Sequence, residues 1–232
     1  MKIIGILGGM SAASTQIYYD KLCTLTAKRL GGLHSPELII RSVNFAEIED
    51  LQNKGAWFEA GDRLNYEAKK LESYGAEVLV LATNTMHKLT DQIMNGVSIP
   101  LVHIADATAE RIVKAGLKSP ALIATKFTME QSFYTDRLIA MGLTPILPDE
   151  SSRQIIHDII YGELCLNIRN EQSKTVFENM ARKLSAEGAD SVILGCTEVC
   201  LLLDQDNVDF PVFDTTSIHC DAALKAALSK TD

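Results

Sequence analysis

The stretch "GAEVLVLATNT" at residues 75–85 has a counterpart in "GADSVILGCTEVC" at residues 188–200, which begins 113 positions later (188 − 75 = 113). In both copies a glycine precedes a short apolar run, and polar residues follow it at once. Such a run is typical of a parallel strand that helices cover on both faces. Thr83 in the first copy stands where Cys196 stands in the second. The sequence therefore predicts two equivalent buried strands, each of which ends at a polar side chain.

The repeat extends well beyond these two strands. The segment "AKKLESYGAEVLVLA" at residues 68–82 parallels "ARKLSAEGADSVILG" at residues 181–195, which is a helix, a turn and a strand in each case. Two more pairs keep the same order: "YYDKL" (18–22) with "YTDRL" (134–138), and "IPLVH" (99–103) with "FPVFD" (210–214). Any two strand–helix units look somewhat alike, but an ordered series of matches favours an internal duplication.

Short apolar runs alternate with longer amphipathic segments along the chain, which predicts an α/β protein with parallel sheets covered by helices. We expect two duplicated α/β halves related by a pseudo-twofold axis, with the active site in the cleft between them. Ligands of open α/β sheets bind beyond the carboxyl ends of the strands, where Thr83 and Cys196 both lie. Two such residues on opposite sides of one ligand would suit removal of a proton from one face of a carbon and its delivery to the other.

Composition narrows the class of protein. The chain has 232 residues, 47% of them apolar, which is enough to build a sizeable core. Its formal charge of −8 disfavours a nucleic-acid partner, because binding to phosphates depends on clustered Lys and Arg. No apolar run approaches the roughly eighteen residues of a membrane span. The N-terminal apolar run is short and interrupted by Gly8 and Gly9, which favours a strand and turn over a secretory signal. We expect a soluble, cytoplasmic protein.

The sequence predicts neither a metal nor a cofactor. Cys196 and Cys200 are four residues apart, unlike the CxxC pairs of structural zinc sites, and no second cluster completes a ligand set. The glycines of "GILGGM" at residues 5–10 do not satisfy the GxGxxG spacing of dinucleotide-binding folds, and no lysine context indicates pyridoxal phosphate. An odd number of cysteines in an intracellular chain predicts free thiols; they are Cys23, Cys165, Cys196, Cys200 and Cys220.

Three motifs carry a resemblance to a known family: "GILGGM" at residues 5–10, "TNTMH" at 83–87 and "GCTE" at 195–198. Their order and spacing, over nearly the whole chain, resemble the aspartate/glutamate racemase family of cofactor-independent amino-acid racemases. In that family a cysteine from each half flanks the substrate Cα. The resemblance implies that Cys196 deprotonates the L-enantiomer and that Thr83 stands on the opposite face, where most members carry the other cysteine. A hydroxyl donates a proton far more easily than it accepts one.

The resemblance also implies that main-chain amides and hydroxyls at strand ends hold the substrate. The residues that it assigns to this role are Met10, Ser11, Gln52, Asn84, Thr85, Thr125 and Thr197. Gln52 is a candidate for the α-carboxylate. Two further residues have open roles: His87 either orients the site or caps a helix, and Glu198 either tunes the thiol or favours the start of the next helix.

Two departures from the family pattern bear on specificity. The first turn reads "GGMSAAS" instead of the more usual Gly-Pro form, and Cys165 lies where aspartate-selective relatives tend to place a lysine. We expect a substrate among aspartate, glutamate or a broader set of amino acids. The resemblance further implies a homodimer. The domain boundaries that we predict are 1–100 with 212–232 returning to it, and 101–211.

Two other functions stay open. A hydantoin racemase, isomerase or decarboxylase of the same superfamily would use the same fold and cysteine on another substrate. A non-catalytic, two-lobed protein that binds a small molecule would explain the duplication without any need for Cys196, which would then be a small buried hydrophobic residue.

Overall fold

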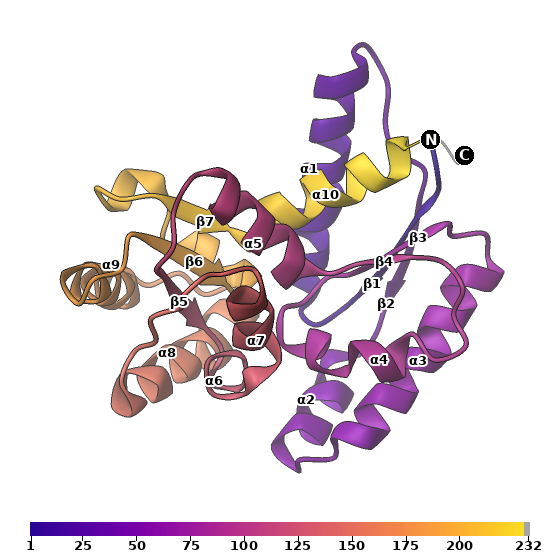
Figure 1. Cartoon of the computed structure of the whole chain (residues 1–232). Helices are drawn as coiled ribbons and strands as arrows, with labels where there is room; N and C mark the ends of the chain where they lie inside the picture. Colours follow the sequence, from indigo (N-terminus) through magenta and orange to yellow (C-terminus); the bar gives the residue numbers. More distant parts are fainter. Residues whose placement is uncertain (230–232) are drawn as a thin grey trace. The chain divides into compact units, whose positions relative to one another are not determined.

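The structure is a computed structural model that describes residues 1–229, apart from the side chain of Leu201. The fold is α/β with two parallel sheets (Figure 1). The chain divides into two compact units. The first contains Met1–His103 and the chain from His219 onward, and the second contains Ile104–Ile218. No helix of the described residues is both long and apolar enough to span a membrane.

The sheet of the first unit has four parallel strands in the order β2-β1-β3-β4. The strands are β1 (Ile4–Gly8), β2 (Leu38–Ser42), β3 (Val78–Leu81) and β4 (Leu101–Val102). The two central strands, β1 and β3, are buried along their whole length. This is why they lack an alternation of apolar and polar residues.

Helices cover both faces of this sheet (Figure 1). Ile6 and Val80 pack on one face against α1 (Ala12–Leu30) and α10 (Thr215–Leu228). Leu7 follows Ile6, and Leu79 precedes Val80. Because successive side chains of a strand point to opposite faces, Leu7 and Leu79 pack on the other face of the sheet. The helices on that face are α2 (Phe45–Asn53), α3 (Trp57–Ser73) and α4 (Thr90–Ile93).

The sheet of the second unit has three parallel strands in the order β5-β6-β7. They are β5 (Pro120–Ala124), β6 (Ser191–Gly195) and β7 (Val212–Asp214). A parallel bridge between Ala121 and Ile146 places a short extended segment beside β5. If this segment is counted as a strand, its position corresponds to that of β2, and β5, β6 and β7 correspond to β1, β3 and β4. This agreement is what an internal duplication produces.

The helices of the second unit share one hydrophobic core with β5 and β6, in which Tyr134 and Phe177 are among the largest fully buried side chains. The helices are α5 (Ile104–Lys114), α6 (Lys126–Glu130), α7 (Ser132–Ala140), α8 (Glu150–Gly162) and α9 (Glu171–Ala186). Short 3₁₀ turns complete the chain: η1 (Thr85–Leu89), η2 (Leu164–Leu166), η3 (Thr197–Leu201) and η4 (Gln205–Asn207).

The turn before each strand of the quoted repeat is built in the same way. Gly75 and Gly188 end α3 and α9 with φ of 101° and 106°. In each copy the N–H of the glycine donates to the carbonyl three residues earlier, and the N–H of the following residue donates to the carbonyl five residues before itself. These two distances are 2.9 and 3.1 Å in the first copy, and both are 3.0 Å in the second. Glycine suits this left-handed helix end because it has no Cβ.

Candidate active site

The turn after β1 lies at the carboxyl edge of the first sheet. Gly9 has φ of 89°, and a Cβ there would lie 2.2 Å from the Val43 carbonyl oxygen, so the turn requires glycine. Ser11 caps α1 by accepting a hydrogen bond from the Ser14 N–H at 3.2 Å. The Ser14 hydroxyl in turn donates to the Ala82 carbonyl at 3.0 Å. These bonds hold the turn against the end of β3.

Thr83 lies two residues beyond the end of β3, and its side chain and those of Asn84 and Thr85 are all buried. The Nδ1 atom of His87 lies 2.7 Å from the Thr83 carbonyl oxygen. Because a carbonyl only accepts, Nδ1 must carry the proton. The His87 ring therefore bonds the peptide of Thr83 at the strand end.

His87 belongs to a cluster of buried histidines in the first unit. Its ring centroid lies 4.5 Å from that of His103 and 5.6 Å from that of His219. His219 donates from Nε2 to the Val102 carbonyl at 2.8 Å and accepts at Nδ1 from the Tyr18 hydroxyl at 2.7 Å. Burial lowers the pKa of His219 to about 4, so this ring is neutral near neutral pH.

Gln52 brings the end of α2 to the same edge. It is 4% exposed, and its amide nitrogen lies 2.9 Å from the sulfur of Met86, which follows Thr85 in η1. The predicted residues of the first unit therefore gather at the carboxyl edge of one sheet: Met10, Ser11, Gln52, Thr83, Asn84 and Thr85.

In the second unit, Cys196 follows β6 directly and is 7% exposed. Its Sγ donates a hydrogen bond to Oε2 of Glu198 at 3.0 Å, and Glu198 is itself buried. Burial raises the pKa of Cys196 well above its ordinary value, and the charge of Glu198 and the nearby Cys165 add to the rise. The resting side chain is therefore a thiol whose proton points at a carboxylate.

Cys165 lies on η2, which packs against η3. Burial, followed by the charge of Glu198, raises the pKa of the Cys165 thiol. The position thus supplies a neutral, half-buried side chain next to the Cys196–Glu198 pair, and it offers no positive charge to a ligand there.

The other two predicted residues of the second unit flank Cys196. Thr197 is buried and begins η3. Thr125 follows β5, and the strand register pairs Ala124 with Gly195, so Thr125 and Cys196 leave their strands at the same level. The Thr125 hydroxyl caps α6, where it accepts from the Thr128 N–H at 3.4 Å and shares a hydrogen bond with the Thr128 hydroxyl at 3.1 Å.

The sequence reasoning overlooks the third strand end of this sheet. At the end of β7 the chain reads Asp214-Thr-Thr-Ser217, a polar run that begins on the last residue of the strand. The comparison of repeats stops at Asp214 and so misses it. Thr216 is 1% exposed, and no described residue forms a hydrogen bond with its hydroxyl.

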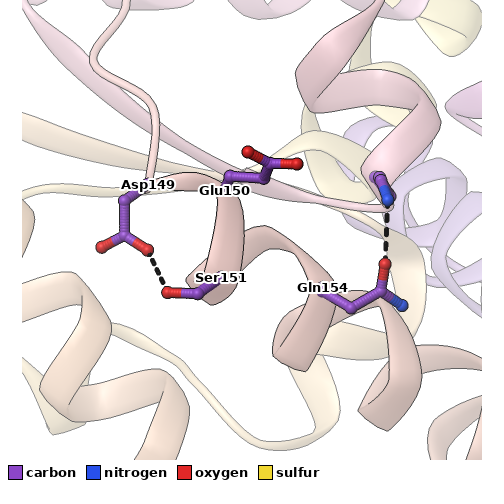
Figure 2. Close-up of a pocket in the computed structure, with 5 residues that line it drawn as sticks. Asp149, Glu150, Ser151 and Gln154 are labelled. Carbon is purple, nitrogen blue, oxygen red and sulfur yellow. Dashed lines mark hydrogen bonds between the residues drawn. The ribbon is translucent and has the colours of Figure 1, made fainter.

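A separate hollow of about 610 Å³ lies at the start of α8 (Figure 2). Its lining residues are Lys126, Asp149, Glu150, Ser151 and Gln154. The Lys126 ammonium donates to the Gln154 side-chain oxygen at 2.9 Å. The Ser151 hydroxyl donates to Asp149 at 2.7 Å, and this contact is drawn in Figure 2. It contains none of the predicted residues. Within residues 1–229, no three His, Cys, Asp or Glu side chains cluster so as to hold a metal ion.

Comparison with known proteins places these observations in a family. The model of the family described as Asp/Glu/Hydantoin racemase matches residues 7–223. The broad specificity amino-acid racemase RacX of Bacillus subtilis (strain 168) is 25% identical over 98% of this chain and 99% of its own.

Two solved structures are similar over nearly the whole chain. One, from Yersinia pestis, is provisionally assigned as an Asp/Glu racemase; it is 46% identical, with a TM-score of 0.91 over 99% of this chain and 100% of its own. The other is an aspartate racemase homologue from Pyrococcus horikoshii OT3; it is 36% identical, with a TM-score of 0.86 over the same shares.

Proposed function

The chain belongs to the Asp/Glu/hydantoin racemase family, and on that premise we propose that it is a cofactor-independent amino-acid racemase that removes and returns the proton at Cα. The observation that carries the proposal is the buried hydrogen bond from Cys196 Sγ to Glu198 Oε2, 3.0 Å long, at the end of β6. A thiol and a carboxylate in contact form a pair that can pass a proton to and from a ligand.

In the proposal, Glu198 makes a base of Cys196. Loss of the thiol proton to solvent would leave two negative charges together in a buried place, which the raised pKa of Cys196 reflects. Transfer of that proton to Glu198 keeps the charge of the pair at −1. The Cys196 thiolate then takes the α-proton of the L-substrate, and the electron pair of the broken C–H bond is left on the substrate as an enediolate-like carbanion.

Thr83 is the proposed donor on the opposite face of the same carbon. Its O–H bond breaks as a new C–H bond forms, which gives the D-enantiomer. The alkoxide so produced regains a proton from solvent or a neighbour, and Glu198 releases to solvent the proton that it took from Cys196, which restores the starting charges. The His87 bond to the Thr83 carbonyl supports this role because it fixes the peptide that carries the donor. Main-chain and hydroxyl donors at the strand ends would stabilise the developing negative charge.

The proposed substrates are acidic amino acids or a broader set that includes them. The description of the Pyrococcus horikoshii relative favours aspartate, and that of RacX favours a broad range. The neutral Cys165 beside Cys196 and Glu198 supports the broader range, because it supplies no charged partner for a side-chain carboxylate. The homodimer stays a prediction.

The proposal is tested with Cys196→Ala in heavy water. Nuclear magnetic resonance should show that the wild-type protein exchanges the α-proton of at least one L-amino acid and that the variant exchanges none. Cys23→Ala, in α1, is the matched control, and this variant should exchange the α-proton at the wild-type rate. Exchange at the wild-type rate in Cys196→Ala would contradict the role of the thiol.

A panel of amino acids and hydantoins, analysed by chiral chromatography, separates the possible enzymes. Inversion of free amino acids is expected. Binding without exchange would indicate a two-lobed binding protein, and inversion of hydantoins alone would indicate a hydantoin racemase. The proposal also requires that the rate survive dialysis against a chelator and treatment with hydroxylamine, which removes pyridoxal phosphate.

A further inference from the structure

At the end of β7, nearly every polar side chain of the run from Asp214 to Ser217 forms a hydrogen bond within the fold. The Asp214 carboxylate accepts from the N–H groups of Thr216 and Ser217 at 2.9 and 3.1 Å, and it also accepts from the Ser217 hydroxyl. The Thr215 hydroxyl donates to the Leu194 carbonyl at 2.8 Å and so ties the start of α10 to β6. These bonds fix the turn and cap the helix.

The Thr216 hydroxyl is the exception. It is buried, with the whole side chain 1% exposed, and no residue of the described chain accepts from it or donates to it. A buried hydroxyl without a partner lowers stability, since it has lost water and gained nothing. Threonine at this position is therefore unfavourable for folding alone, and valine, which has the same shape, would suit it better.

The location of Thr216 connects it with Cys196. Strand β6 lies between β5 and β7, and the register pairs Leu194 with Asp214. Cys196 and Thr216 are each two residues beyond that pair. The bond from Thr215 to Leu194 holds the first turn of α10 beside the end of β6. The end of β6 is thus flanked by Thr125 on one side and Thr216 on the other.

We propose that the Thr216 hydroxyl accepts a hydrogen bond from the α-ammonium group of the bound amino acid. This inference rests on the proposed function. The ammonium is the polar group of the substrate that fits this corner, because the carboxylates of Asp214 and Glu198 stand at the two strand ends and the N–H groups of Thr216 and Ser217 are already taken by Asp214. A substrate carboxylate would meet two like charges there.

The burial of Thr216 does not distinguish it from the other candidate residues. Cys196 and Thr83 are both 7% exposed, and Thr197 is 3% exposed. Low exposure is thus a property that Thr216 shares with the residues that the proposal places against the substrate.

The test compares two ligands that differ by the amino group. Isothermal titration calorimetry of the full chain with L-aspartate and with succinate measures both affinities in wild type, Thr216→Val and Thr216→Ser. The valine variant should bind L-aspartate roughly tenfold more weakly, as expected for loss of a hydrogen bond to a charged group. It should bind succinate as the wild type does, and the serine variant should restore the affinity for L-aspartate.

Thermal unfolding distinguishes a ligand-binding role of Thr216 from a structural role, because loss of a stabilising hydrogen bond would lower Tm. Thr216→Val should have a Tm equal to or above that of the wild type. Thr26→Val is the matched control, because the buried Thr26 hydroxyl donates to the Leu22 carbonyl at 2.8 Å; it should lower Tm and leave both affinities unchanged.

Three results would overturn the assignment of Thr216. The first is that the valine variant binds L-aspartate and succinate more weakly by the same factor, and the second is that it binds L-aspartate with unchanged affinity. The third is that the wild type binds neither ligand. Tight binding of L-aspartate with no chiral conversion would contradict the racemase proposal alone, and the comparison of affinities would still decide the role of Thr216.

Discussion

Thr83 and Cys196 occupy the same position in the two copies of the repeat but have different neighbours. The residue two places after Cys196 is Glu198, which accepts a hydrogen bond from the Cys196 Sγ itself. The residue four places after Thr83 is His87, which bonds the Thr83 carbonyl and leaves the hydroxyl for other partners. In the proposed mechanism, these neighbours let Cys196 give up and regain a proton through a carboxylate, whereas His87 holds the proposed donor Thr83 in place.

Glu198→Gln tests the proton acceptor. The amide keeps the shape but cannot take the thiol proton, so the exchange rate of the L-substrate should fall by about 100-fold or more at neutral pH. The residual rate should increase with pH, because solvent hydroxide must then ionise a thiol whose burial persists.

Glu187→Gln, at a carboxylate that is 47% exposed, is the control and should leave the rate unchanged. An unaltered rate in a folded Glu198→Gln protein would remove Glu198 from the mechanism.

The sequence predicts the candidate residues well where a strand end determines them. Met10 and Ser11 follow β1, and Thr83, Asn84 and Thr85 follow β3, because buried apolar runs locate strands reliably. The hydrogen bonds of His87 and Glu198 could not be predicted, since the choice between capping and orienting depends on side-chain directions that sequence spacing does not determine.

At the scale of elements, the two copies of the repeat agree down to single hydrogen bonds. Gly75 and Gly188 end equivalent helices with nearly equal positive φ, and a Cβ at either would meet no atom within 4 Å. The need for glycine at these two turns is therefore conformational and not steric.

Gly75→Ala and Gly188→Ala should each lower the free energy of unfolding by about 1 kcal/mol, because an L-residue is strained at positive φ. Urea unfolding measures both changes, and the two should be similar. Gly162→Ala, in the last turn of α8 with equally open space, is the control and should be neutral or slightly stabilising. A large difference between the first two variants would show that the turns are not energetically equivalent.

Some elements lie beyond sequence prediction for physical reasons. Strand β4 pairs through only two residues, so its existence depends on β3 beside it. The bridge at Ile146 is a single pair, and no periodicity reveals it. The packing of η2 against η3, which brings Cys165 to Cys196, is a tertiary contact between residues about 30 positions apart.

At the scale of the whole molecule, the buried His219 couples stability to pH. His219 has a pKa of about 4 in the folded chain and an ordinary value of 6.5. Between these two values the unfolded chain binds more protons at this residue, so stability is fully present above about pH 6.5 and is lost as the pH falls towards 4. The ring of His87 and the Tyr18 hydroxyl face His219, and the ring of His103 lies against that of His87.

The contribution of His219 should amount to a loss on the order of 2 kcal/mol between pH 6.5 and 5. Urea unfolding of wild type and His219→Gln at both pH values measures it, and the variant should show a smaller difference by that amount. His34→Gln, at an exposed position, should keep the wild-type difference. Equal pH dependence in wild type and His219→Gln would show that His219 titrates alike in the folded and unfolded chain.

The central claim of the proposed function is that Thr83 and Cys196 differ in their ability to act as a base. Racemisation has an equilibrium constant close to one, so both directions share the same overall kcat/KM, and an asymmetry must appear in proton exchange. In heavy water, the α-proton is followed by nuclear magnetic resonance and inversion by chiral chromatography in one sample.

The account predicts that wild-type protein exchanges the L-enantiomer faster than it inverts it, because carbanions often return to the Cys196 side, while the D-enantiomer exchanges no faster than it inverts. Thr83→Cys adds a second thiol with an ordinary pKa of about 8.5 and should raise inversion and narrow the gap. Exchange of the D-enantiomer without inversion, as readily as that of the L-enantiomer, would show that Thr83 is a full base and would contradict the account.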